Sequence, residues 1–426
     1  MNKIPPNLYD KIKYFATFPQ TGVSLRQMVK FGQKPSQGTL LRASQFLMEE
    51  LPIRLAHRVV ELENLPHGLS LMPSVIKVKN WYADSFSDLT TFPKPELPQD
   101  VRDKLKATLR PTGDGIELTS SSKNFDITNG NSVPLPHRYY ASVKDIEFPS
   151  EISEYNNAFC RLIEGVKRRH DPVVTTIVSY RYVSASNGIL EFKHTRKSNS
   201  VDVDIQSFLD RFYMSRIGIR MLIGQHITLQ KGPHNTDHVG IICTKTNLAE
   251  VTQEAIDNAK FICEDYYGLF RAPEVKLICK DDLEFMYVPS HLHHMLFELL
   301  KNSLRAVVET YGSDPDDPYP PIKIIVAEGK EDITIKISDE GGGIPRSGLP
   351  MVWTYMYTTA STPSLDPDFN RSDFKAPLAG FGYGLPLSRL YARYFGGDLK
   401  IISMEGYGTD AYLHLSRLSD SEEPLP

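Results

Sequence analysis

The sequence has few cysteines, no long apolar run and no cluster of basic residues. Its four cysteines form no C-x-x-C pair and no metal-ligand spacing, so we expect reduced, buried or idle thiols rather than a disulfide framework or a zinc site. No apolar stretch approaches the roughly 18 to 20 residues that cross a bilayer. A net charge of −4 without a Lys/Arg block offers no electrostatic attraction for nucleic acid. Neither nucleic acid nor a membrane span is therefore expected.

The start of the chain, MNKIPPNLYDKIKYFA, carries no recognisable targeting signal. It has neither the apolar region of a secretory signal nor the Arg-rich, Ser-rich composition of an organelle transit peptide. These residues alone indicate a cytosolic protein, or a numbering that begins near a processed end. With 426 residues, 41% of them apolar and 23% charged, the chain has the composition of a soluble globular protein and the length of two domains.

The hydrophobic pattern up to residue 230 is helical. Ile205, Phe208 and Phe212 share one face of DIQSFLDRFYMSRIGIRMLIGQH. Further helical patterns cover 38–66, 76–92 and 151–180. Pro52 falls inside the first of these, where we expect a break or kink. Residues 1–230 are thus predicted to form an all-α bundle, with a mobile insertion at 110–137, which is rich in Ser, Asn and Gly.

From residue 231 onward, strand patterns appear. Ile333, Ile335 and Ile337 alternate with polar residues, and EGKE, just before them, suits a hairpin turn. DLKIISM and DAYLHL are further strand patterns near the end of the chain. Helical segments lie among these strands without a regular βαβ alternation, so residues 231–426 are predicted to form an α+β domain.

The helical segment HLHHMLFELLKNSLRAVVE carries an apolar stripe and a polar stripe. The apolar stripe consists of Leu296, Leu299, Leu300, Leu304 and Val307. The polar stripe aligns His294, Glu298, Asn302 and Arg305 at spacings of four, four and three residues. A solvated helix face with i, i+4 pairs is one interpretation. Asn302 favours a second, because an amide oxygen suits Mg²⁺, which takes only one or two protein oxygens when it bridges phosphates.

Two glycine-rich segments follow. In ISDEGGGIP a strand ends before Asp339, and three glycines come after Glu340. These glycines allow positive φ, and the Asp339 carboxylate can accept a hydrogen bond from a base amino group; a tight acidic turn is the alternative. In GFGYGLPLSRLYARYFGG the glycine spacing fits neither a Rossmann loop nor a P-loop, and no protein-kinase signature is present. Pro386 suits a first helical turn, where phosphate could bind.

The order of these three motifs resembles the Bergerat nucleotide-binding fold of gyrase B, heat-shock protein 90, MutL and histidine kinases. Within that superfamily the chain is most similar to the mitochondrial pyruvate dehydrogenase kinase family. HMLFELLKNSLRAVVE, SDEGGGIP, YMYTTAS, GFGYGLPLSRLYARYFGGDL and SMEGYGTDAYLHL carry the resemblance in the second half, and SLRQMVKFG, QFLMEELPIRLAHR, NWYADSF and RRHDPVV carry it in the first. It covers most of the chain except 110–137 and the extreme ends.

The resemblance implies an activity and a set of partners. It implies a serine kinase that uses ATP and Mg²⁺ to phosphorylate and inactivate the E1α subunit of pyruvate dehydrogenase while docked on the E2 lipoyl domain. It also implies a homodimer formed through the C-terminal sheet, and location in the mitochondrial matrix. The related branched-chain 2-oxoacid dehydrogenase kinases are the nearest alternative. A Bergerat ATPase acting as a conformational clamp would need a transducer domain, and little chain follows Thr409. A non-catalytic scaffold would lack Asn302 or Glu298, and both are present.

The resemblance also assigns roles to residues of the second half. Glu298 is the candidate general base, which His294 could hold or tune. Asn302 is the Mg²⁺ ligand, and Asp339 contacts adenine. The rest of the implied ATP site is Arg305, Gly341, Gly343, Thr358, Thr359, Gly380, Phe381, Gly382, Tyr383, Gly384, Leu385 and Thr409, with a lid over 360–379.

In the helical half, the resemblance implies two further pockets and two departures from animal relatives. A pocket for pyruvate or dichloroacetate maps to Tyr82, Ser85, Lys167, His170, Ser215, Arg216, Ile219 and Arg220. An apolar lipoyl pocket maps to Leu25, Met28, Phe31 and Phe46, for which core packing is the alternative. Lys167 stands where animal members have arginine, which removes the planar fork of a guanidinium. The end of the sequence, HLSRLSDSEEPLP, lacks the Asp-Trp tail of animal members.

Overall fold

The computed structural model describes eight stretches of the chain and divides it into two compact units. The described ranges are 4–33, 35–94, 150–173, 203–232, 237–313, 318–355, 357–358 and 382–425. The first unit comprises Met1–Ser200 and Ser215–Ile241, and the second comprises Val201–Met214 and Ile242–Pro424. The expected insertion at 110–137 and the end of the helical pattern at 151–180 lie outside the described residues.

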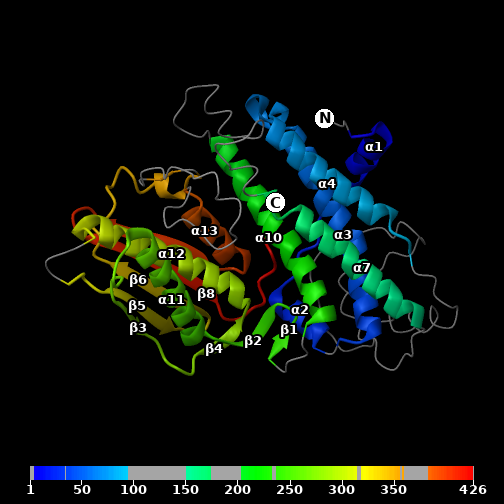
Figure 1. Ribbon diagram of the computed structural model, residues 1–426. Helices are drawn as coiled ribbons and strands as arrows, with labels where there is room; N and C mark the ends of the chain where they lie inside the picture. The colour runs from blue at the N-terminus through cyan, green and yellow to red at the C-terminus, as the bar shows by residue number, and fades with distance from the viewer. Residues whose placement is uncertain are drawn as a thin grey trace. The chain divides into compact units, whose positions relative to one another are not determined.

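The described part of the first unit is built from helices (Figure 1). They are α1 (Pro6–Phe15), α2 (Leu25–Gly32), α3 (Gln37–Glu63), the 3₁₀ helix η1 (Pro66–Leu71), α4 (Pro73–Thr91), α7 (Ser150–Arg169) and most of α10 (Val203–Lys231), followed by the short strand β1 (His238–Val239). Ser24 begins α2 with a reciprocal capping box to Gln27, and the Ser36 hydroxyl accepts a hydrogen bond from the Thr39 amide at the start of α3. Their packing buries Phe86 and Phe159 completely.

The break that Pro52 could have introduced does not occur. α3 is 27 residues long and continues through Pro52, and most of its side chains are buried. An internal proline removes one backbone hydrogen bond and crowds the preceding turn, at a cost of about 3 kcal/mol. Burying a single large apolar side chain contributes roughly 1.5 to 3 kcal/mol. The tertiary packing of α3 therefore outweighs the local preference of proline.

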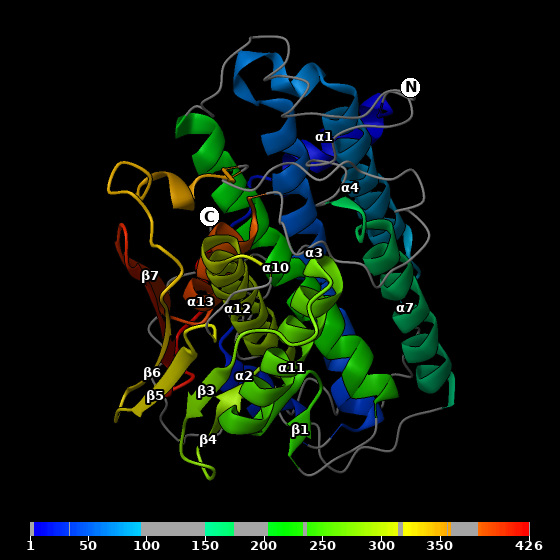
Figure 2. The ribbon, with the colours of Figure 1, turned by 60° about the vertical axis from the view of Figure 1, so that its left-hand side comes forward.

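The second unit contains a five-stranded sheet and three long helices of its own. Its elements after the first residues of α10 are β2 (Ile242–Asn247), α11 (Leu248–Tyr267), β3 (Val275–Ile278), β4 (Glu284–Tyr287), α12 (Pro289–Tyr311), β5 (Ile322–Glu328), β6 (Asp332–Asp339), the 3₁₀ helix η2 (Met351–Trp353), α13 (Gly384–Tyr394), β7 (Asp398–Met404) and β8 (Gly408–Ser416). The strand order is β3-β5-β6-β8-β7, with β3 parallel to β5 and the other pairs antiparallel. α11, α12 and α13 lie on the same side of this sheet in both views (Figures 1 and 2).

The alternation along β6 creates the core between the sheet and the helices. Ile333, Ile335 and Ile337 are buried, and Ile335 pairs in register with the buried Leu413 of β8. The Gly329 amide donates to the Asp332 carbonyl oxygen at 2.8 Å and closes the β5–β6 hairpin. The predicted strands and hairpin are confirmed, as is the α+β class.

The other expectations about composition can be compared with the structure. All four cysteines lie in the described ranges and are free, and Cys160, Cys243 and Cys263 are buried. Within the described ranges, no helix combines the length and the apolarity needed to cross a membrane.

Candidate active site

The polar stripe of α12 contains a nearly buried ion pair. The Lys301 ammonium donates to Glu298 Oε1 at 2.9 Å, and the two side chains are 5% and 15% exposed. The apolar stripe on the same helix is buried, as predicted, from Leu296 to Val307. Because the buried apolar face fixes the orientation of α12, the Glu298 carboxylate and the Lys301 ammonium occupy defined positions on its polar side.

His294 lies one turn before Glu298 and packs against an aromatic ring. Its ring and that of Tyr391 meet edge to face with centroids 5.2 Å apart. Burial lowers the pKa of His294, and the nearby Glu298 charge raises it in part. The described residues include no hydrogen bond between the two side chains. His294 is thus a packing group in this structure, and no hydrogen bond among the described residues lets it hold Glu298.

Asp339 ends β6 with its carboxylate buried and held by three donors. The Ser303 hydroxyl donates to Oδ2 at 2.8 Å, and the Gly341 and Thr409 amides donate to Oδ1 at 3.1 and 3.3 Å. Burial raises the pKa of the Asp339 carboxyl, and these hydrogen bonds offset only part of that rise. Because all three donors favour the charged form, the group is an oriented hydrogen-bond acceptor.

The glycine turn after Asp339 lies against α12 and the β7–β8 turn. A Cβ at Gly341 would lie 2.6 Å from the Ala306 Cβ, and one at Gly343 would lie 2.0 Å from the Met404 carbonyl oxygen. Gly342 and Gly343 have φ values of +78° and +70°, which only glycine adopts readily. The expected positive φ is therefore confirmed at two of the three glycines, and close packing explains the third.

The start of α13 lies against the Glu298 carboxylate. A Cβ at Gly384 would lie 2.4 Å from Glu298 Oε2, so the glycine allows this approach. Gly382 has φ +76°, and Pro386 occupies the first turn of the helix, as predicted. The Tyr383 side chain is buried beside Tyr355, with ring centroids 5.7 Å apart. Thr359, Gly380, Phe381 and the expected lid at 360–379 lie outside the described residues.

Asn302, which the resemblance assigns as the Mg²⁺ ligand, lies on the polar stripe of α12. Its side chain is half-buried, follows Glu298 by one turn, and makes no hydrogen bond to any described residue. A neutral amide oxygen is a type of ligand that Mg²⁺, which prefers oxygen ligands and keeps several waters, can accept. Arg305, one turn further on, lies 3.6 Å from the Glu309 carboxylate.

Thr409 lies beside Asp339 through its amide, while its hydroxyl is 2.9 Å from that of Ser403. Of the other residues assigned to the ATP site, Leu385 is half-buried and Thr358 is exposed.

Two residues of this site lie in the segment from Glu298 to Arg305 that the resemblance assigns to the ATP site, but neither was given a role from the sequence. Lys301 follows Glu298 by three residues, a spacing at which opposite charges meet on a helix. Ser303 lies four residues after Leu299 and four before Val307, on the apolar face of α12. A polar residue on a buried face requires a hydrogen-bond partner, and that position was the available signal.

Six of the eight residues expected to form the pyruvate pocket line one small cavity in the first unit. They are Tyr82, Lys167, His170, Arg216, Ile219 and Arg220, joined by Val166 and Ile223. Ser85 lies behind the cavity, with its hydroxyl 2.9 Å from His170 Nε2. Ser215 is buried but does not line it. The structure therefore brings together most of the predicted set.

The cavity combines three cationic side chains with a neutral histidine. Burial, followed by the charges of Arg216 and Arg169, lowers the pKa of His170 to about 3. The Arg216 guanidinium donates to the His170 carbonyl oxygen at 2.8 Å, and that of Arg220 donates to Asp171 Oδ1 at 2.6 Å. The charge of the cavity favours an anion, but its volume of about 10 Å³ holds about one water, so a carboxylate would require the lining side chains to move.

The residues assigned to the lipoyl pocket are packed side chains in this structure. Leu25, Met28 and Phe46 are buried, and Phe31 is half-buried. This is the core-packing alternative, and their contact with a lipoyl group stays a prediction.

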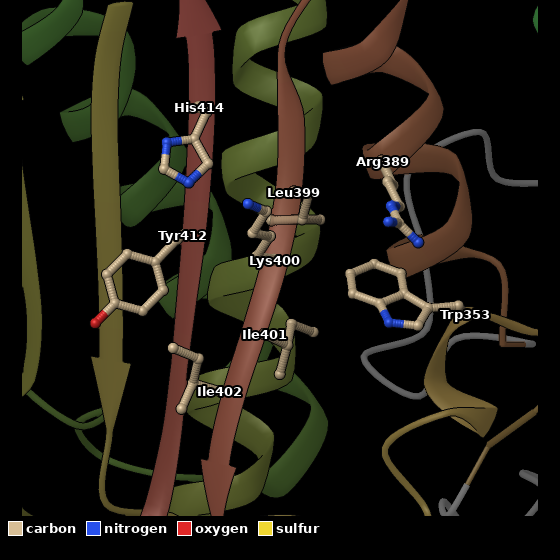
Figure 3. Close-up of a pocket in the computed structure, with 8 residues that line it drawn as sticks. All are labelled: Trp353, Arg389, Leu399, Lys400, Ile401, Ile402, Tyr412 and His414. Carbon is tan, nitrogen blue, oxygen red and sulfur yellow. The ribbon is translucent and has the colours of Figure 1, made fainter.

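The outer face of the sheet carries a shallow hollow of about 400 Å³ at its β7 edge. Figure 3 shows Tyr412 and His414 on β8 beside Ile402 on β7, with Arg389 next to the Trp353 ring. The Arg389 guanidinium lies 4.4 Å from the centre of that ring. Ile402 and Met404 on this face are 59% and 60% exposed. The apolar side chains of Ile402 and Met404 on β7 are therefore open to solvent in the described part of the second unit.

Comparison with known proteins first defines the class of the site. A sequence profile described as "Histidine kinase-, DNA gyrase B-, and HSP90-like ATPase" matches residues 287–419. This range includes α12, the glycine turn and α13, so the second unit is an ATP-binding domain of this class. A second profile, described as "Mitochondrial branched-chain alpha-ketoacid dehydrogenase kinase", matches residues 22–243.

Full-length relatives then define the family. The chain is 46% identical over 441 residues to a mitochondrial [pyruvate dehydrogenase (acetyl-transferring)] kinase of Schizosaccharomyces pombe, covering 100% of both chains. It is 46% identical to the corresponding Arabidopsis thaliana kinase, covering 99% of this chain and 97% of the relative. Identity to isozyme 3 of Homo sapiens is 38%, over 98% and 88% of the two chains. The chain belongs to the mitochondrial pyruvate dehydrogenase kinase family.

Proposed function

We propose that this protein is an ATP-dependent serine kinase that phosphorylates, and thereby inactivates, the E1α subunit of the pyruvate dehydrogenase complex. Full-length similarity to kinases of that name supports the substrate. The observation that carries the chemistry is that Glu298 of α12 lies against Gly384 at the start of α13, while Ser303 of the same helix hydrogen-bonds to Asp339. In this proposal Glu298 serves as the base, Asn302 as the metal ligand and Asp339 as the adenine acceptor. The hydrogen bond from Ser303 to Asp339, which joins α12 to the end of β6, supports a single site.

The mechanism is positioning followed by proton transfer. Asp339 accepts a hydrogen bond from the adenine amino group, and the backbone amides from Gly382 to Leu385 bind the phosphates at the start of α13. Glu298 lies against that helix start and accepts the proton of the substrate hydroxyl, while Lys301 holds its other oxygen. Phosphoryl transfer needs orientation and charge neutralisation more than covalent help, so these few groups suffice.

Mg²⁺ is the expected metal, and Asn302 is the residue that would hold it. When bound, Mg²⁺ neutralises the charge that develops on the phosphate oxygens. The donor set fits, because the Asn302 oxygen accepts no hydrogen bond from the described residues and phosphates supply the other ligands.

Two partner interactions belong to the same proposal. The exposed Ile402 and Met404 on the outer face of the sheet support a homodimer formed through this face. Ile402→Glu combined with Met404→Glu should give a monomer in sedimentation experiments, whereas Phe261→Glu, at a 70% exposed position on α11, should not. We also propose docking on the E2 lipoyl domain and location in the mitochondrial matrix, and the relatives' names, which include "mitochondrial", support the mitochondrion.

The cavity in the first unit is proposed as the regulatory site for pyruvate or a similar small carboxylate. Its lysine and two arginines supply the charge for such an anion. Lys167→Met should weaken inhibition by the carboxylate without changing the KM for ATP. Inhibition that is unaffected by this change would place the effector elsewhere.

A phosphorylation assay with two substrates tests the function. The purified chain is incubated with ATP and either pyruvate dehydrogenase E1 or branched-chain 2-oxoacid dehydrogenase E1, with and without the E2 lipoyl domain, and the sites are mapped. Serine phosphorylation of the pyruvate E1α with loss of its activity is expected. Selective labelling of the branched-chain E1 would instead support the alternative suggested by the profile over residues 22–243.

A further inference from the structure

Ser303 has an unusual hydrogen bond for a serine inside a helix. A hydroxyl in this position commonly donates to a carbonyl oxygen one turn earlier, as Thr252 of α11 does to the Leu248 oxygen at 2.7 Å. Ser303 instead donates across to Asp339 Oδ2 at 2.8 Å, at a site where both residues are buried. Its hydroxyl therefore joins α12 to the end of β6.

This contact determines which part of the Asp339 carboxylate is left for a ligand. A carboxylate has roughly four lone-pair positions, and Oδ1 already receives the amides of Gly341 and Thr409. With Ser303 on Oδ2, about one position is left, and its direction is fixed. An ionised carboxylate held in this way accepts a hydrogen bond and cannot donate one.

We propose that Ser303 is a positioning residue that sets the preference of this site for a 6-amino purine. This inference rests on the proposed ATP site, in which Asp339 faces the base. A 6-amino group donates to the remaining lone pair, whereas the 6-oxo group of hypoxanthine presents an acceptor to an acceptor. A rotated carboxylate would lose this discrimination, because its lone pair would no longer be directed at the amino group.

Ser303 also lies next to Asn302 on α12. Adjacent residues of one helix therefore serve the base and the metal, and Gly341 packs against Ala306 on the same helix, where a Cβ would lie 2.6 Å from the Ala306 Cβ. A change at Ser303 alters the orientation of Asp339 while leaving Glu298 and Asn302 in place. It should therefore affect nucleotide binding more than turnover.

The test uses the full chain with ATP and inosine triphosphate. For Ser303→Ala we expect the KM and the calorimetric Kd for ATP to rise roughly tenfold, the values for inosine triphosphate to change less than about twofold, and kcat to be nearly unchanged. Ser303→Cys, a weak donor of similar size, should resemble Ser303→Ala. Ser303→Thr, which retains a hydroxyl, should keep the wild-type preference for ATP over inosine triphosphate. Thr252→Val is the matched control, because it removes a buried helix hydroxyl bonded to its own backbone.

Two results would overturn the proposal. One is unchanged ATP affinity in Ser303→Ala and Ser303→Cys. The other is an equal loss for both nucleotides, which would indicate a structural role only. Calorimetry needs no protein substrate, so failure to phosphorylate E1 would count against the proposed function while leaving this inference tested.

Discussion

The Lys301 ammonium lies 2.9 Å from the Glu298 carboxylate, three residues earlier on α12, and both side chains are nearly buried. Lys301 holds Oε1 of the Glu298 carboxylate, and Oε2 lies against Gly384 at the start of α13. The candidate base is therefore placed between a lysine and the helix start at which phosphate is expected.

Glu298→Gln should remove the base and keep its shape. We expect kcat to fall by about 10² to 10⁴, while the Kd for ATP changes little, because the amide preserves the volume beside Gly384. Initial rates with E1 and calorimetry with ATP measure the two quantities. Wild-type turnover in this variant would exclude Glu298 as the base.

Asn302→Ala should abolish Mg²⁺-dependent transfer without unfolding the protein. The side chain makes no hydrogen bond to any described residue, and alanine is a better helix former than asparagine. Circular dichroism checks the fold, and a phosphorylation assay across a Mg²⁺ titration checks the activity. Near-normal phosphorylation would remove Asn302 from the metal site.

Asp339→Ala should weaken ATP binding by about 1.5 to 3 kcal/mol, because a charged acceptor is lost. It also leaves Ser303 and two backbone amides without their acceptor, so some loss of stability is expected. Calorimetry with ATP and a denaturant titration separate the two effects. If ATP affinity is unchanged, Asp339 does not contact the base.

Gly384→Ala should slow turnover without a large loss of stability. The new Cβ would lie 2.4 Å from Glu298 Oε2, and the carboxylate, as the end of a flexible side chain, would move away from the helix start. Misplacing a reacting group by about 1 Å can cost on the order of 10²-fold in rate. Gly165→Ala on α7, where the added Cβ would meet no described atom within 4 Å apart from its chain neighbours and the nearby backbone of its own helix, is the control and should keep the wild-type rate.

His226 should make the first unit sensitive to acid. Its ring is 2% exposed, neither ring nitrogen has a hydrogen-bond partner among the described residues, and burial lowers its pKa from 6.5 to about 4. The unfolded chain therefore binds the proton first as the pH falls. The stability that His226 contributes is complete above about pH 6.5 and is lost as the pH falls toward 4, amounting to about 2 kcal/mol between about pH 7 and pH 5.

The variant His226→Leu isolates this contribution. Urea unfolding of the wild type and the variant at the two pH values should give a smaller drop in the free energy of unfolding for the variant. His170 and His291 titrate in both proteins, because burial lowers their pKa to about 3, so their contributions cancel in the comparison. Equal drops would show that His226 is not the source.

The elements that could be predicted from the sequence are those set by local periodicity. The alternation of Ile333, Ile335 and Ile337 and the apolar stripe of α12 each place one face in the core, whatever else the chain does. The glycine turn was also predictable, because Gly342 and Gly343 adopt backbone angles that other residues avoid. The assignments to individual site residues came from resemblance to a family, since spacing alone left a solvated helix face or an acidic turn open.

Local periodicity is enough to establish which residues face the core and which polar groups lie on one side of α12. Which of those polar groups meet depends on the tertiary packing. Ser303 and Asp339 are 36 residues apart in the chain, and α3 continues through Pro52 because its neighbours bury it. Periodicity reports the direction in which a side chain points on its own element, whereas hydrogen bonds and burial depend on the element packed against it.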